Sequence, residues 1–226
     1  MSWPQAVIFD LDGTLMDSAP AIAEAINQVR ADRGGPPVGV DLIRKLVSRG
    51  VKELLATSLG TFATTPENDI AAFRAIYGEL PPRAEHLYPG AAAMLHKLHS
   101  QGIRLGICTN KPQALTERIL TALGLIDCFA AVLGGDACAR VKPHPDHVHE
   151  TLARMGVSPA AAVFVGDSEV DGEAAAAAGL PFILVTFGYA IGNMDEIVHS
   201  VRIDNFDDLP DALHEIVLRR DTRDRG

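Results

Sequence analysis

The 226-residue chain is 47% hydrophobic and 22% charged, which excludes an intrinsically disordered protein because such chains are poorer in apolar residues. Its formal net charge is -9, whereas nucleic-acid-binding proteins usually carry an excess of basic residues, so a nucleic-acid-binding function is not expected. Three cysteines without a C-x-x-C pair favour a reducing compartment over a disulfide framework. No basic leader precedes the first apolar stretch and no apolar run approaches the ~20 residues of a membrane span. We therefore expect a cytoplasmic protein with no membrane or nucleic-acid partner.

Short apolar runs rich in β-forming residues alternate with helical patterns over much of the chain. The helical patterns carry apolar residues at i, i+3 and i+4, as in Leu115, Ile119 and Leu123. This alternation predicts an α/β fold, a doubly wound (Rossmann-like) parallel sheet whose ligands gather at the carboxyl ends of the strands. The predicted strands are Ala6–Phe9, Leu105–Cys108, Ala131–Leu133, Val163–Val165 and Phe182–Val185.

One segment interrupts this alternation with helix after helix. Between residues 17 and 87 every apolar pattern has helical spacing, and turn-forming residues at 34–37 and 64–67 separate the helices. We therefore expect an α/β core made of residues 1–16 and 88–226 and an inserted all-helical domain at 17–87. The charged end of the chain, residues 219–226, lacks apolar periodicity and is expected to fray.

Polar residues follow four of the predicted strands. Asp10-Leu11-Asp12-Gly13-Thr14 follows the first and Thr109-Asn110-Lys111 the second, while Lys142-Pro143 comes a short loop after the third. Gly166-Asp167-Ser168-Glu169-Val170-Asp171 closes the fourth. Each motif alone has an ordinary explanation, such as a turn, a helix cap or a surface lysine. Their coincidence at four strand ends favours one shared site.

This ordered set of motifs resembles the haloacid dehalogenase-like superfamily of hydrolases. The resemblance covers nearly the whole chain, and it implies that the helical insert is a cap domain over the catalytic core. The run Lys142-Pro143-x-Pro145, together with Gly188-Tyr189, is similar to phosphoglycolate phosphatase-like members of the superfamily.

The charges of these residues fit the needs of phosphoryl transfer, which requires a nucleophile, cations on the equatorial oxygens and a proton for the leaving oxygen. Asp10 is suited to be the nucleophile that forms an aspartyl phosphate. Asp12 would protonate the leaving alcohol and then deprotonate the hydrolytic water. Thr109 and Lys142 would bind phosphate oxygens. The residues expected to bind substrate in the core are Asp10, Leu11, Asp12, Thr109, Asn110 and Lys142.

A metal ion is expected because Asp10 and Asp167, placed together, would repel each other and the phosphate. Oxygen ligands favour Mg²⁺. The resemblance implies ligation by the carboxylates of Asp10 and Asp167 and by the backbone carbonyl of Asp12. Asp171, one helical turn beyond Asp167, would support the metal as an outer partner or through water. Its ordinary alternative is a first-turn acid that the helix dipole stabilises.

Three weaker candidates lie outside these motifs. Arg49, between Ser48 and Gly50 in the insert, is either a cationic contact for an anionic substrate or a solvated surface residue. His144, His147 and His149 are expected to be surface histidines at the start of a helix. Cys108 is expected to be a small core residue.

The resulting expectation is Mg²⁺-dependent hydrolysis of a small phosphate monoester, with phosphoglycolate as the leading substrate. A phosphomutase acting on a sugar phosphate is an alternative, because it would use the same four motifs. A phospho-accepting signalling or binding protein is the alternative from another class. The sequence leaves the oligomeric state open between monomer and homodimer.

Overall fold

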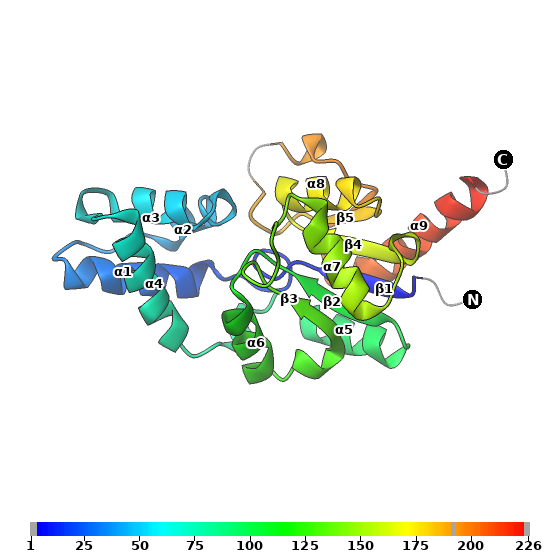
Figure 1. Ribbon diagram of the computed structural model, residues 1–226, viewed down its shortest axis with the longest axis horizontal. Coiled ribbons are helices and arrows are strands. Elements are labelled where there is room, and N and C mark those ends of the chain that lie inside the picture. The colour runs from blue at the N-terminus through cyan, green and yellow to red at the C-terminus, as the bar shows by residue number, and fades with distance from the viewer. Residues whose placement is uncertain (1–3, 191–192, 224–226) are drawn as a thin grey trace. The chain divides into compact units, whose positions relative to one another are not determined.

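A computed structural model describes residues 4–190 and 193–223, and the chain divides into two compact units. The α/β unit contains residues 1–16 and 87–226, and the helical unit contains residues 17–86 (Figure 1). The predicted α/β class with an inserted helical segment is confirmed.

The α/β unit is built on a six-stranded sheet of order β3-β2-β1-β4-β5-β6, in which every neighbouring pair is parallel. Five strands lie where the apolar runs predict them. The sixth was missed because it is three residues long and carries Arg202 at its centre. The strands are β1 (Ala6–Phe9), β2 (Arg104–Cys108), β3 (Phe129–Leu133), β4 (Ala162–Gly166), β5 (Phe182–Val185) and β6 (Val201–Ile203).

Helices cover both faces of this sheet. Alternate residues of β1 point to opposite faces, so that Val7 and Phe9 join one hydrophobic cluster and Ala6 and Ile8 join the other. The first cluster takes side chains from α5, α6 and α9, and the second from α7 and α8. These helices are α5 (Ala91–Ser100), α6 (Gln113–Ala122), α7 (Pro145–Met155), α8 (Glu169–Ala177) and α9 (Leu209–Arg223).

The helical unit is held by polar contacts as well as by its apolar residues. The buried guanidinium of Arg30 donates hydrogen bonds to the carbonyls of Pro36, Ser58 and Leu59, at 2.6, 2.6 and 2.9 Å. Arg30 thereby satisfies carbonyls at the C-terminal end of α3 that the helix itself leaves open. The helices of this unit are α1 (Ala19–Asp32), α2 (Val40–Arg44), α3 (Val51–Leu59) and α4 (Pro66–Glu79).

The two segments that connect the units run side by side. Met16 and Leu87 form an antiparallel bridge, and the Tyr88 amide donates to the Leu15 carbonyl at 3.0 Å. The Asp17 amide donates to the carbonyl of His86 at 2.7 Å. The chain therefore leaves the α/β unit and returns to it at adjacent points.

The expected fraying of residues 219–226 is wrong for the part that the structure describes, because α9 continues to Arg223. Arg219 pairs with Glu215 one turn earlier and donates to the Ser200 carbonyl at 3.0 Å, which ties this turn to the preceding loop. Residues 224–226 lie outside the described part. Over the described helices, no stretch is both long enough and apolar enough to cross a bilayer.

Candidate active site

The loop after β1 begins with Asp10, whose amide still donates to the Val165 carbonyl of β4 at 3.0 Å. The chain turns sharply at Gly13, where φ is +87°. A Cβ atom at Gly13 would lie 2.3 Å from Oδ2 of Asp167, so only glycine lets this turn approach the carboxylate of the neighbouring strand end.

Asp167 follows β4 and is fixed from both sides. Its Oδ1 accepts from the Thr14 hydroxyl at 2.9 Å, and its Oδ2 accepts from the Tyr189 amide at 2.7 Å. Burial, together with the nearby carboxylates of Asp171 and Asp10, raises the pKa of Asp167 well above its ordinary value. The side chain is thus held in one orientation in a place that disfavours its negative charge.

Asp171 organises this strand end. Its Oδ2 accepts from the amide and hydroxyl of Ser168, at 3.1 and 2.7 Å, and from the Asp167 amide at 3.2 Å. The contact from the Ser168 amide is one half of a capping box at the start of α8, and the Ser168 side chain, which accepts from the Asp171 amide, is the other half. Its Oδ1 accepts from Nζ of Lys142 at 2.6 Å. Asp171 is therefore both the first-turn acid of α8 and the partner of a buried lysine.

Lys142 is buried between two carboxylates, since its Nζ also lies 3.0 Å from Oδ1 of Asp10. Burial alone would lower the pKa of Lys142, but Asp10 and Asp171 outweigh it and raise that pKa above its ordinary value. The ammonium group is therefore a permanent positive charge next to the proposed nucleophile.

Asp10 Oδ1 is unusual among the side-chain atoms that the structure describes. It is the one buried oxygen or nitrogen there with no hydrogen-bond partner, because the Lys142 ammonium lies at ion-pair distance without hydrogen-bonding geometry. Burial raises the pKa of Asp10 to about 6, against the opposing effect of Lys142. A buried carboxylate oxygen left unsatisfied in this way is costly unless a ligand completes it.

The loop after β2 supplies three further polar residues. Thr109 is buried, and its hydroxyl accepts from the Lys111 amide at 3.3 Å. The side chain of Asn110 donates to the Lys142 carbonyl at 3.0 Å, so that it braces the loop carrying that lysine. Nζ of Lys111 lies 3.0 and 3.1 Å from the two carboxylate oxygens of Asp12. Lys111 follows Thr109 and Asn110 directly in the sequence but was not among the residues predicted to act in the site.

His147 corrects the expectation of surface histidines for one of the three residues. It is fully buried, accepts from the Lys142 amide at 3.4 Å through Nδ1, and bonds the Leu133 carbonyl at 3.2 Å through Nε2. Burial, and to a smaller extent the positive charge of Lys142, lowers the pKa of His147 to about 4. The ring is therefore neutral near pH 7. The sequence placed His147 near the start of a helix but did not show that this position of α7 faces the protein interior. His144 and His149 are not buried.

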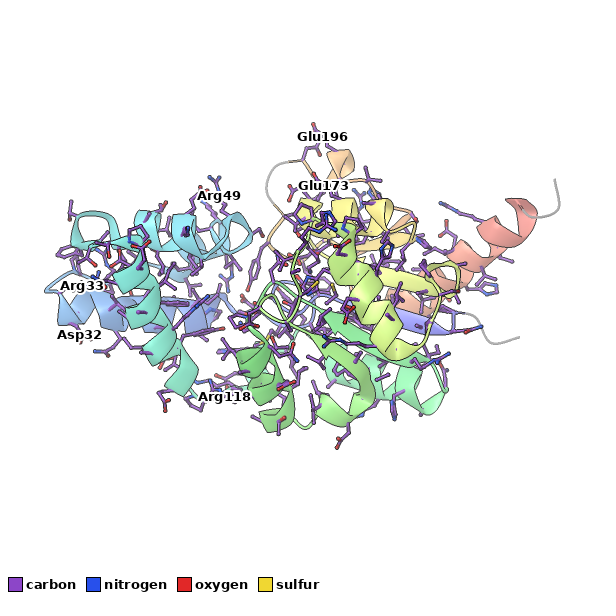
Figure 2. All side chains as sticks on the ribbon, viewed as in Figure 1. Asp32, Arg33, Arg49, Arg118, Glu173 and Glu196 are labelled. Carbon is purple, nitrogen blue, oxygen red and sulfur yellow. The ribbon has the colours of Figure 1, made fainter. Side chains whose placement is uncertain are left out.

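Of the remaining candidates, Leu11 and Cys108 belong to the α/β unit and Arg49 to the helical unit. The Leu11 side chain packs in the hydrophobic core, which leaves only its backbone for a ligand. Arg49 belongs to the helical unit, in a short segment before α3 (Figure 2), and pairs with Glu53 at 2.8 Å with 43% of its side chain exposed. Cys108 is fully buried, and burial raises the pKa of its thiol to about 12, as befits a core residue.

The residues present fit a divalent cation. One carboxylate oxygen from each of Asp10, Asp167 and Asp171 lies within 4.8 Å of the other two, and Oδ1 of Asp10 is buried without a hydrogen-bond partner. If all three carboxyl groups were ionised, the single ammonium of Lys142 would leave two negative charges for a cation to balance. A set made only of oxygen donors is the one that Mg²⁺ prefers.

A pH-dependent effect of metal on stability is expected from these carboxyl groups. The pKa of Asp10 is raised from 3.8 to about 6, so its contribution to stability is present below pH 4 and is lost as the pH rises through 6. Mg²⁺ would bind the ionised form and offset that loss. We expect the rise in melting temperature on adding Mg²⁺ to be larger at pH 7.5 than at pH 5, as measured by differential scanning fluorimetry. An equal rise at both values would contradict this.

The chain matches a known protein family. A model of the haloacid dehalogenase-like hydrolases matches residues 4–179, which include all four strand-end motifs. The chain belongs to this family. The expected resemblance to it, and the assignment as a hydrolase, are therefore confirmed.

Proteins similar to this haloacid dehalogenase-like hydrolase include phosphoglycolate phosphatases. It is 40% identical to a phosphoglycolate phosphatase of Rhodobacter capsulatus, over 91% of this chain and 94% of that protein. The solved structure of a predicted phosphoglycolate phosphatase from Haemophilus somnus superposes with a TM-score of 0.83 at 29% identity, covering 93% and 98% of the two chains. A CbbY variant from Rhodobacter sphaeroides, in complex with xylulose-(1,5)bisphosphate, gives 0.75 at 26% identity, covering 91% and 96%.

Proposed function

We propose that the protein is a Mg²⁺-dependent phosphatase that hydrolyses a small phosphate monoester, phosphoglycolate above all, through an aspartyl phosphate. The observation that carries the proposal is Oδ1 of Asp10, a buried carboxylate oxygen without a hydrogen-bond donor beside the ammonium of Lys142. A nucleophile needs such an unshared oxygen, and the adjacent cation attracts the phosphoryl group toward it. The similarity to phosphoglycolate phosphatases supports the substrate.

The reaction divides into two transfers. In the first, Asp10 attacks phosphorus, the bond to the ester oxygen breaks, and Asp12 gives that oxygen a proton. In the second, Asp12 takes a proton from water, which attacks the aspartyl phosphate and releases inorganic phosphate. Lys142 and Thr109 bind phosphate oxygens throughout, and the Asn110 backbone amide assists them.

The metal would be held by the carboxylates of Asp10 and Asp167 and by the carbonyl of Asp12. When bound, Mg²⁺ supplies positive charge that offsets the repulsion between phosphate and these carboxylates. Asp171 has both carboxylate oxygens engaged by Lys142 and by the Ser168 end of α8. We therefore assign Asp171 to support of the site, acting on the metal through Asp167 or water.

A phosphate-release screen of the purified protein tests the function. Phosphorylated metabolites that include phosphoglycolate would be compared with and without Mg²⁺, and the organic product would be identified in each case. Release of glycolate and phosphate only with Mg²⁺ is the expected result. Conversion of a sugar phosphate into its isomer without phosphate release would instead identify a phosphomutase.

The helical unit is proposed to act as a cap that recognises the part of the substrate beyond the phosphate. Within it, Arg49 lies beside Gly50, where φ is +85°, and its exposed guanidinium could bind a carboxylate in bidentate fashion. A charged hydrogen bond of this kind contributes roughly 1.5–3 kcal/mol.

Arg49→Ala is therefore expected to lower kcat/KM for phosphoglycolate by roughly 10- to 150-fold. Ethyl phosphate, which lacks the carboxylate, should lose much less, and steady-state kinetics on both substrates measure the difference. Arg44→Ala, another exposed arginine of the same unit, serves as the control. Equal losses on both substrates, or no loss on either, would remove Arg49 from carboxylate recognition.

A further inference from the structure

Lys111 holds the carboxylate of Asp12 from the neighbouring strand end. Its Nζ lies 3.0 Å from Oδ1 and 3.1 Å from Oδ2, so the ammonium contacts both oxygens. The lysine follows β2 and the aspartate follows β1, and these strands are adjacent and parallel. The contact therefore joins two loops at the carboxyl edge of the sheet.

Burial makes this ion pair different from a surface contact. Only 4% of the Lys111 side chain is exposed, against 19% for Asp12. A buried ammonium needs a partner, and the Asp12 carboxylate supplies it here. The pair therefore fixes the position of the Asp12 carboxylate relative to the loop after β2.

The two lysines at this edge have separate partners. Lys142 is paired with Asp10 and Asp171, on the side of the nucleophile and the proposed metal. Lys111 is paired with Asp12, the residue proposed to protonate the leaving oxygen. A proton donor contributes only when it lies within hydrogen-bond reach of that oxygen, and a displacement of about 1 Å can cost ~100-fold in rate.

We propose that Lys111 is a positioning residue, which fixes the Asp12 carboxyl group for proton transfer to the leaving oxygen. The inference rests on the proposed function, because it requires Asp12 to be the proton donor. Lys111 then acts through Asp12 and not on the phosphoryl group. Its removal should harm substrates in proportion to their need for leaving-group protonation.

The experiment compares an alkyl with an aryl phosphate in the Mg²⁺-loaded enzyme. For Lys111→Met, kcat/KM for phosphoglycolate should fall by ~10- to 100-fold, and kcat/KM for 4-nitrophenyl phosphate by less than ~3-fold. The ratio kcat/KM is used because it reports steps up to the release of the alcohol or phenol, and so excludes the later hydrolysis of the aspartyl phosphate. Lys97→Met, at an exposed position on α5, is the matched control.

A double variant separates positioning from direct contact. If Lys111 acts through Asp12, adding Lys111→Met to Asp12→Ala should lower kcat/KM for phosphoglycolate by less than ~3-fold further. If Lys111 contacts the phosphoryl group, the two losses should multiply. Thermal unfolding checks that each variant is folded. Lys111→Gln, which keeps an N–H donor for Asp12, replaces Lys111→Met if the latter does not fold, and should lose less activity.

The outcomes separate this inference from the function on which it rests. A loss confined to phosphoglycolate in both Asp12→Ala and Lys111→Met supports the inference. If Asp12→Ala shows that selectivity and Lys111→Met lowers both substrates equally, the positioning role is overturned while Asp12 remains the proton donor. If Asp12→Ala itself shows no selectivity, the proton-donor assignment fails, and the role of Lys111 fails with it.

Discussion

Replacing Asp10 with Asn should lower kcat/KM for every phosphate monoester by ~10⁴-fold or more, the scale of losing a catalytic nucleophile. Asparagine has nearly the shape of aspartate, so the loss would reflect chemistry more than packing. The buried Oδ1 that lacks a hydrogen-bond donor would become part of a neutral amide, which can neither attack phosphorus nor hold a cation as a carboxylate does.

Two measurements make the Asp10→Asn experiment decisive. Steady-state phosphate release gives the rate, and acid-quenched labelling with a radioactive monoester should show no phosphorylated protein in the variant. Asp127→Asn, at an exposed position beyond α6, controls for the amide substitution itself. An Asp10→Asn protein within ~10-fold of the parent would remove Asp10 as the nucleophile.

Replacing Asp167 with Asn should abolish the response to Mg²⁺, and we expect kcat/KM to fall by about two to four orders of magnitude. Asp167 is held by Thr14 and Tyr189 and is buried beside Asp10, so its carboxylate has one orientation in which to meet a cation. Removing its charge would weaken metal binding more than it changes the shape of the site.

The matched comparison for Asp167→Asn is Asp12→Asn, in which the same chemical change is made two residues from Asp10. Only the backbone carbonyl of residue 12 is proposed to meet the metal, so Asp12→Asn should keep the Mg²⁺-induced rise in melting temperature. Measuring that rise, rather than the melting temperature itself, cancels the cost of leaving Lys111 buried without its carboxylate partner. Equal loss of the Mg²⁺ effect in both variants would overturn the assignment of ligands.

The strands could be predicted from the sequence where a short run of apolar residues marks them. Five strands were evident because each is a short apolar run, and all of them except β3 are wholly or largely buried. Their shared carboxyl edge followed from the parallel order. The edge strand β6 was missed, because a three-residue strand with a central arginine has no apolar pattern to detect.

The contacts within the site could not be read from the sequence in the same way. Lys111 and His147 each look like ordinary polar residues of a loop and a helix start. Lys111 meets Asp12 across 99 residues of chain because β1 and β2 are adjacent in the sheet. His147 contacts the nearby Lys142 amide, but its second partner, the Leu133 carbonyl, is brought to it by the packing of α7 on β3. Thr14 and the Tyr189 amide also meet Asp167 only after folding, across more than a hundred and fifty residues in the case of Thr14.

The paired connection at Met16 and Leu87 has a consequence for how such enzymes diversify. Because the chain departs and returns at bridged neighbours, a segment of almost any length can be accommodated there with little strain on the sheet. An exchange of segment 17–86 for another folded module would leave the six strands and their carboxyl-edge residues covalently intact. The helical segment could therefore change during evolution while the strand-end residues proposed to carry out catalysis stay the same.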